Sequence, residues 1–390
     1  MNDTDILQSF FLIFGGAAVI ATTALYLRQP MLVAYIALGA LAGPSGLTLV
    51  DDTALLSGIA EIGIIFLLFL VGLDLPTHKL KNMLGESLLT AFGTTAVFFS
   101  AGAGVMLVFG YTVIEALIVG IAMTFSSTIL GIKLLPTTVL HHRHIGEIVI
   151  SLLLVQDLLA IVALLFVGFM GNPTEHHNIA MIGLAVGLPA LIVGALLVVR
   201  FVLLPLLEKF DEFHEYVFLL AIGWCLTIAQ LAHSLGLSYE VGGFIAGVSL
   251  ATSPIAQYIA THLKPLRDFF LVMFFFTVGA SIDLSLLQGV WLPISVLSIT
   301  VLLVKPLTFT RLLHMQGESL SNAKEVGLRL GQASEFSLLV SYVAIHASLL
   351  SMESAVILQA ATVLTLLINS YLVVSRYPNP IAANPALRRD

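Results

Sequence analysis

The 390-residue chain contains one cysteine, Cys225, which excludes an internal disulfide and a cysteine metal cluster. Charged residues are also scarce, at 10% of the chain, where about 25% is usual for soluble domains. The first ten residues include two aspartates and no basic residue, so we interpret the first apolar run as a retained helix and not as a cleaved signal peptide. No basic run indicates a nucleic-acid partner.

Long apolar segments dominate the remaining sequence, since 58% of the residues are apolar. A span of about 20 apolar residues is long enough to cross the hydrocarbon of a bilayer. The pattern predicts an all-α, multi-pass membrane protein with about 13 transmembrane helices. The predicted spans are near residues 6–27, 30–43, 55–74, 84–109, 113–134, 146–170, 178–206, 216–235, 238–253, 266–283, 290–312, 324–347 and 353–375.

Of the 16 lysines and arginines, 15 lie at the ends of these segments, and they occur at alternate connections. The positive-inside rule therefore predicts an outside N-terminus and a cytoplasmic C-terminus. One cytoplasmic connection carries the run His141, His142, Arg143 and His144. Histidine titrates between pH 5 and 8, so this run is either a pH sensor or a solvated loop.

An internal repeat is visible at an offset of 207 residues. EIGIIFLLFLVG at residues 61–72 aligns with DFFLVMFFFTVG at residues 268–279, with glycine on glycine and acid on acid. The copies lie in the third and the tenth predicted spans, an offset of seven, so the second copy enters the membrane from the opposite side. This is the inverted-repeat plan of secondary transporters.

The same offset relates two polar runs in the middle of spans, Thr124–Thr128 and Gly331–Glu335. Such runs weaken a helix, and non-helical backbone at this depth occurs where it lines a cavity. We expect two broken helices that cross, although serine and threonine also act as simple interhelical contacts. The residues expected to line the breaks are Thr124, Ser126, Ser127, Thr128, Gln332, Ser334 and Glu335.

Two charged residues lie at the predicted midplane. Asp157 is about 16 Å along its helix from Gly146, and Lys305 is the one basic residue inside a span. A charge at this depth persists with a partner or a water-lined path and often marks an ion pathway. We expect Asp157, with Gln156 beside it, to bind a monovalent cation or a proton, and Lys305 to compensate charge. A purely structural Asp157–Lys305 salt bridge and a channel-lining charge are alternatives.

Several motifs together resemble the membrane domain of monovalent cation:proton antiporters, and most closely the Kef-type potassium-efflux branch. The motifs cover nearly the whole chain and are VQDLLAI (155–161), TFSST (124–128), EVGGFIAGVSLATS (240–253), PLRDFFLVMFFFTVGASIDL (265–284), Lys305 and LGQASEFSLLV (330–340). The resemblance implies a core bundle that includes 113–170 and 324–375, scaffold helices elsewhere within residues 1–376, and a cytoplasmic tail at 377–390. It also implies elevator-like motion, a homodimer and a bacterial inner-membrane location.

Two departures from the family pattern affect function. Sodium-selective electrogenic relatives carry two adjacent acids, whereas Gln156 precedes Asp157 here, so we expect exchange of one K⁺ or Na⁺ for one H⁺. Kef-type proteins continue into a cytosolic nucleotide-binding domain, but no glycine-rich dinucleotide fingerprint is present. We therefore expect no cofactor in this sequence and any cytosolic regulatory domain or subunit to lie outside it, whether the sequence is a naturally short member or part of a longer protein.

Three other functional classes compete with antiport as interpretations of these residues. A sodium-coupled organic solute symporter also uses crossed helices, but a buried lysine near a QD pair suits proton exchange better. A channel-like K⁺ efflux pathway would use the same charged residues. An intramembrane hydrolase is disfavoured because the sequence has no paired-aspartate dyad, no HExxH motif and no Gly-x-Ser-x-Gly elbow. We do not expect an enzyme.

Overall fold

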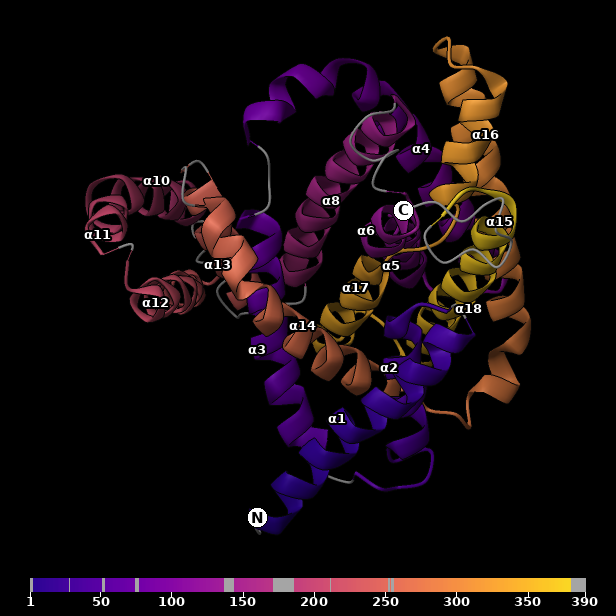
Figure 1. Ribbon diagram of the computed structural model, residues 1–390. Coiled ribbons are helices and arrows are strands. Elements are labelled where there is room, and N and C mark those ends of the chain that lie inside the picture. The colour runs from indigo at the N-terminus through magenta and orange to yellow at the C-terminus, as the bar shows by residue number, and fades with distance from the viewer. Residues whose placement is uncertain are drawn as a thin grey trace. The chain divides into compact units, whose positions relative to one another are not determined.

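A computed structural model shows helices throughout the part of the chain it describes (Figure 1). The described residues are 3–27, 29–50, 53–73, 77–136, 144–170, 186–210, 212–251, 253 and 256–379. Each of the thirteen predicted spans coincides with one or more helices in these residues. Seven of the described helices are long and apolar enough to cross a membrane, and five shorter apolar helices accompany them. The protein is therefore a multi-pass helical membrane protein.

The chain divides into two compact units. The first unit contains residues 1–51, 82–167 and 278–390. Its helices are α1 (Asp3–Tyr26), α2 (Met31–Ala42), most of α4 (Thr77–Val108), α5 (Val113–Met123), α6 (Thr128–Lys133), most of α8 (His144–Met170), α15 (Leu287–Met315), α16 (Leu320–Arg329), α17 (Glu335–His346) and α18 (Met352–Arg376). Within it, α15 packs against α16 and α18, while α17 packs against α5 and α18.

The second unit contains residues 52–81 and 168–277. Its helices are α3 (Thr53–Leu73), α10 (Leu188–Val198), the π-helical segment η2 (Val199–Leu203), α11 (Leu204–Lys209), α12 (His214–Ser234), α13 (Tyr239–Ala251) and most of α14 (Ala256–Ala280). α14 begins ten residues before the span predicted at 266–283. A helix can extend past the apolar run into its charged flank, here through Pro265, which hydropathy alone does not reveal.

Two predicted spans are interrupted in the middle, as expected. The span at 113–134 is α5 followed by α6, and the span at 324–347 is α16 followed by α17. Each second half starts at a serine N-cap: the Ser127 hydroxyl accepts a hydrogen bond from the Leu130 amide, and the Ser334 hydroxyl accepts one from the Phe336 amide. These caps satisfy amides that a broken helix leaves without partners. The serine residues of both runs therefore stabilise a helix break at that position.

The inverted repeat is visible in the packing as well as in the sequence. The two N-caps, Ser127 and Ser334, are 207 residues apart, as are Gly72 and Gly279. A Cβ at Gly72 would lie 2.7 Å from the Phe244 carbonyl oxygen of α13, and a Cβ at Gly279 would lie 2.0 Å from the Ile36 carbonyl oxygen of α2. Neither approach leaves room for a side chain, so equivalent glycines permit equivalent close helix contacts in the two copies.

Candidate functional site

The two helix breaks meet at a single side chain in the first unit. The Nζ of Lys305, on α15, donates hydrogen bonds to the carbonyl oxygens of Phe125 at 2.5 Å and Gln332 at 2.9 Å. These two residues are again 207 apart and lie in the two breaks. The Ser126 hydroxyl also donates to the Leu330 carbonyl at 2.8 Å. The broken helices therefore cross, with Lys305 at the crossing.

Lys305 is 1% exposed, and its ammonium also lies 5.0 Å from the ring centre of Phe98. Carbonyls at the end of a helix segment carry partial negative charge because their intrahelical partners are missing. The ammonium faces such carbonyls after α5 and after α16. The direct partners of the ammonium are therefore helix-end carbonyls, and charge compensation by Lys305 stays a prediction.

Asp157 lies on α8 beside the first break and is 8% exposed. Both of its carboxylate oxygens accept from the hydroxyl of Thr128, at 2.9 and 3.1 Å. Thr128 is the first residue of α6, so the break places a neutral donor against the acid. Glu335, the first residue of α17, is near enough to interact electrostatically with Asp157. The two acids predicted from sequence are therefore neighbours in one site.

The alternative of an Asp157–Lys305 salt bridge is not what the geometry shows. Four ion pairs within 4.0 Å occur among the described residues, and none of them includes Asp157 or Lys305. The long lysine side chain reaches the backbone carbonyls instead, because these carry the negative ends of two half-helices. A carboxylate without a fixed cationic partner can exchange one bound cation for another.

The side chain of Gln156 contacts the backbone of the first break. Its Oε1 accepts from the Ser126 amide at 3.1 Å, and its Nε2 lies 3.5 Å from the Thr124 carbonyl oxygen. The Thr124 hydroxyl donates to the Ile121 carbonyl at the end of α5. Gln156 therefore holds the interrupted backbone beside Asp157, in addition to any contact that it makes with a bound cation.

The second break is held by residues that sequence reasoning did not identify. The Ala333 amide donates to the Thr365 hydroxyl at 3.1 Å, and Asn369 donates to the Oε1 of Gln332 and, at 3.0 Å, to the Leu328 carbonyl. A signal was available, because α18 carries a buried row of polar residues at helical spacing: Gln359, Thr362, Thr365 and Asn369.

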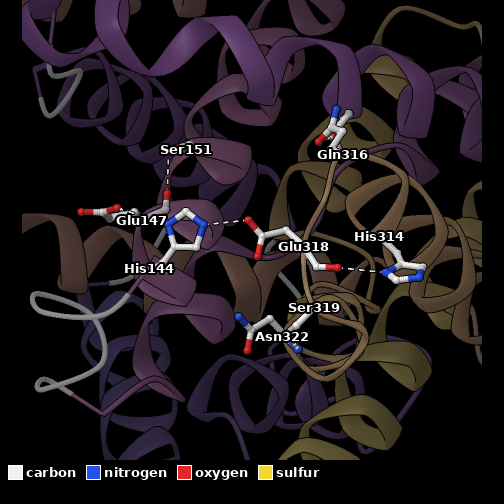
Figure 2. Close-up of polar contacts among 9 residues, drawn as sticks. His144, Glu147, Ser151, His314, Gln316, Glu318, Ser319 and Asn322 are labelled. Carbon is white, nitrogen blue, oxygen red and sulfur yellow. Dashed lines mark hydrogen bonds and ion pairs between the residues drawn. The ribbon is translucent and has the colours of Figure 1, made fainter.

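A second polar cluster lies at the N-terminus of α8 (Figure 2). The Nε2 of His144 lies 2.7 Å from a carboxylate oxygen of Glu318, and its Nδ1 lies 3.6 Å from Glu147. His314 donates from Nδ1 to the Glu318 carbonyl at 2.9 Å. Glu318 of the α15–α16 loop is thus held by two histidines: His144 contacts its side chain, and His314 contacts its backbone carbonyl. The other members of the predicted histidine run, residues 141–143, lie outside the described residues.

His144 is two residues ahead of the predicted span at 146–170, and its side chain is 63% exposed. The hydrogen bond to Glu318 raises the pKa of the His144 imidazole above its ordinary value. The carboxylate favours the protonated ring, so the contact strengthens as the solution becomes more acidic. Because the His144 side chain is exposed, solvent screens the pair and its contribution to stability is modest.

Comparison with known proteins agrees with this geometry. The family model for the transmembrane sodium/hydrogen exchanger matches residues 12–374. Among curated proteins, "K(+) efflux antiporter 6" and "K(+) efflux antiporter 4" of Arabidopsis thaliana are 29% and 28% identical over 354 residues, which are 87% of this chain and 58% of each relative. The chain thus spans little more than half the length of these relatives.

The fold is also similar to a solved structure, that of the sodium proton antiporter MjNhaP1 from Methanocaldococcus jannaschii at pH 8. The TM-score is 0.70 at 17% identity, and the match covers 95% of this chain and 97% of that one. This likeness concerns the fold. The family whose model matches is one of exchangers and not one of symporters or hydrolases.

Proposed function

Because the chain belongs to the sodium/hydrogen exchanger family, we propose that it is a secondary antiporter that exchanges a monovalent cation for protons, with Asp157 binding each in turn. One observation carries the proposal. Asp157 lies at the crossing of two broken helices and touches a neutral hydroxyl, that of Thr128. A carboxylate in this setting can release a proton to bind a cation without first breaking an ion pair.

The surrounding residues would stabilise a cation bound at Asp157 within the hydrocarbon region. A partly dehydrated monovalent cation needs oxygen ligands, and Asp157 and Thr128 supply carboxylate and hydroxyl oxygens. Glu335 adds negative charge nearby. Lys305 stays on the carbonyls of Phe125 and Gln332, so it offsets the helix ends throughout the cycle and does not compete with the cation.

For the transported cation we favour K⁺ over Na⁺, exchanged one for one with H⁺. The curated relatives are named as K⁺ efflux antiporters, and they share more sequence with this chain than the sodium proton antiporter of known structure does. The one-for-one ratio follows from the position of Gln156 before Asp157, which leaves one carboxylate there to exchange ligands.

The expected assembly follows the family resemblance. We propose a homodimer in a bacterial inner membrane, with the N-terminus outside and the C-terminus cytoplasmic. Helices within 113–170 and 324–375 would form the moving core. Any cytosolic regulatory domain or subunit would act on this core from the cytoplasmic side.

Transport is tested with purified protein in proteoliposomes that carry a pH-sensitive dye. An outward proton gradient is imposed, and K⁺, Na⁺, Li⁺ or choline is added outside. K⁺ should dissipate the gradient, Na⁺ less so, and choline not at all. Equal responses to all four salts would show a leak and would reject antiport.

Asp157→Asn should abolish the cation-dependent signal while the protein remains folded. The matched control is Asp283→Asn, because Asp283 is a partly buried loop aspartate whose carboxylate accepts from the Ser285 amide and hydroxyl. The control should exchange at the wild-type rate. Retained exchange in Asp157→Asn would move the binding role to another residue, with Glu335 as the first candidate.

A further inference from the structure

Arg329 is a buried arginine at a position where the sequence indicates a solvated one. It is the last residue of α16, it belongs to the basic residues that mark cytoplasmic connections, and yet it is 2% exposed. A buried guanidinium destabilises the fold unless its charge and its donors are satisfied. The partners that satisfy it therefore indicate what it does.

The guanidinium joins three separate segments of the first unit. Its Nε and Nη2 donate to Oε1 of Glu325, one turn earlier in α16, at 3.0 and 2.7 Å. Its Nη1 donates to the Leu134 carbonyl at 2.8 Å, and its Nη2 donates to the Pro378 carbonyl at 2.9 Å. A planar group with several fixed donors can hold three partners in one geometry, which a lysine ammonium cannot reproduce.

The Leu134 contact fixes one end of α6. This helix has six residues, so it is about 9 Å long and too short to be stable alone. Leu134 is its C-cap, where a cation is favourable against the helix dipole. At the other end Thr128 donates to Asp157. Arg329 and Asp157 therefore hold opposite ends of one short rigid element.

The Pro378 contact ties in the segment Tyr377–Asn379, which follows α18. The ring of Tyr377 lies 5.6 Å from the guanidinium carbon. Asn379 is fully buried, and its Nδ2 donates to the carbonyls of Val374 at 3.2 Å and Tyr377 at 2.8 Å. These contacts hold the segment Tyr377–Asn379 against the core, so a displacement of the segment would also displace the Arg329 guanidinium.

We propose that Arg329 is a positioning residue that couples the segment Tyr377–Asn379 to the ion site through α6. Displacement of the segment shifts the guanidinium, the guanidinium shifts the C-cap of α6, and Thr128 loses its alignment on Asp157. The proposal rests on the proposed antiport through Asp157, and its structural step is measurable without transport.

The transport test compares Arg329→Lys with wild type. Lysine keeps the charge beside Glu325 but loses the fork that holds Leu134 and Pro378. Loss of the Thr128 alignment should raise the KM for K⁺ about tenfold, the factor for one hydrogen bond to a charged group, and should move the acidic limb of the pH profile upward. Asn379→Ala should do the same to a lesser degree. Arg311→Lys, at an exposed arginine of α15, is the matched control and should change neither.

A double-mutant cycle separates positioning from simple loss of stability. In a Thr128→Val background the hydroxyl is already gone, so Arg329→Lys should have no further effect on KM. Additive effects, or an unchanged KM and pH profile in Arg329→Lys, would overturn the proposal. Either result is interpretable as long as wild type exchanges K⁺ and Asp157→Asn does not.

Hydrogen–deuterium exchange of the backbone amides of residues 128–134 tests the structural step alone. Asn379→Ala and Arg329→Lys should both accelerate exchange there, while Arg311→Lys should not. If exchange in α6 is the same in all four proteins, the coupling is absent whatever the transport assays show. If α6 loosens but wild type fails to transport, the proposed antiport is rejected and the mechanical coupling stands.

Discussion

Thr128 donates its single hydroxyl proton to both carboxylate oxygens of Asp157, at 2.9 and 3.1 Å. A hydrogen bond to a carboxylate stabilises the anion by about 1.5 to 3 kcal/mol. Thr128→Val removes this donor at nearly constant volume. The proton should then compete better against the cation, and the acidic limb of the exchange profile should move upward by about one pH unit. The measurement is exchange rate against pH in proteoliposomes.

Thr128→Ser is the control for this prediction, because it keeps the hydroxyl and removes the methyl group. It should retain the wild-type profile. A profile for Thr128→Val that coincides with wild type would mean that the hydroxyl does not set the balance between proton and cation at Asp157.

The helix breaks were predictable because their cause is local. Runs of serine and threonine in mid-span compete for backbone partners, and the repeat offset placed the second run once the first was found. The partners of Lys305 were not predictable in the same way. They are the backbone carbonyls of Phe125 and Gln332, and a carbonyl has no signature in sequence. An acidic side chain was the visible partner, so an Asp157 salt bridge was the natural alternative.

The same limit explains why the burial of Arg329 escaped prediction. Two of its three partners are the carbonyls of Leu134 and Pro378, which are 195 and 49 residues away. The positive-inside rule gives the side of the membrane for a basic residue but not its exposure. The α6 N-cap Ser127, by contrast, is a residue type with a known local role and could be assigned to a break.

Lys305→Gln should destabilise the protein by roughly 3 kcal/mol, because two charge-assisted hydrogen bonds to helix-end carbonyls are lost. The penalty should be nearly the same in an Asp157→Asn background, since the two residues do not form an ion pair within 4.0 Å. Thermal unfolding in detergent measures it, with Lys324→Gln at an exposed lysine as the control.

A direct buried ion pair would give a different result. Breaking one by removing a single partner costs about 3 to 5 kcal/mol, and that cost disappears when the other partner is already gone. If Lys305→Gln is harmless in Asp157→Asn but harmful in wild type, Lys305 and Asp157 are paired after all.

The contact between His144 and Glu318 should make stability depend on pH. The pKa of the His144 imidazole is raised in the folded protein. The contact therefore contributes fully below the ordinary histidine pKa near 6.5, and its contribution is lost as pH rises through the raised pKa. Glu147 also faces the ring. His144→Gln should therefore destabilise at pH 6 by at most about 1 kcal/mol, with little effect at pH 8.

Unfolding temperature against pH checks this for wild type, His144→Gln and Glu318→Gln. His262→Gln, at an exposed histidine of α14, is the matched control and should leave the pH dependence unchanged. Equal destabilisation by His144→Gln at pH 6 and pH 8 would assign the contact to packing and not to charge.

The last prediction concerns the charge moved in each cycle. If Asp157 alternates between one proton and one monovalent cation, the inward and outward movements carry equal charge, and no net charge crosses the membrane. A clamped potential should then leave the exchange rate unchanged, because one uncompensated elementary charge corresponds to about 2.3 kcal/mol per 100 mV. Proteoliposomes clamped with a lipophilic ion of fixed gradient provide the measurement.

The nearby acid Glu335 provides the alternative outcome of this experiment. If Glu335 also released a proton in each cycle, two protons would exchange for one cation, and a potential would accelerate exchange in one direction. Glu335→Gln would then remove the voltage dependence, whereas one-for-one exchange through Asp157 predicts that neither protein responds to it.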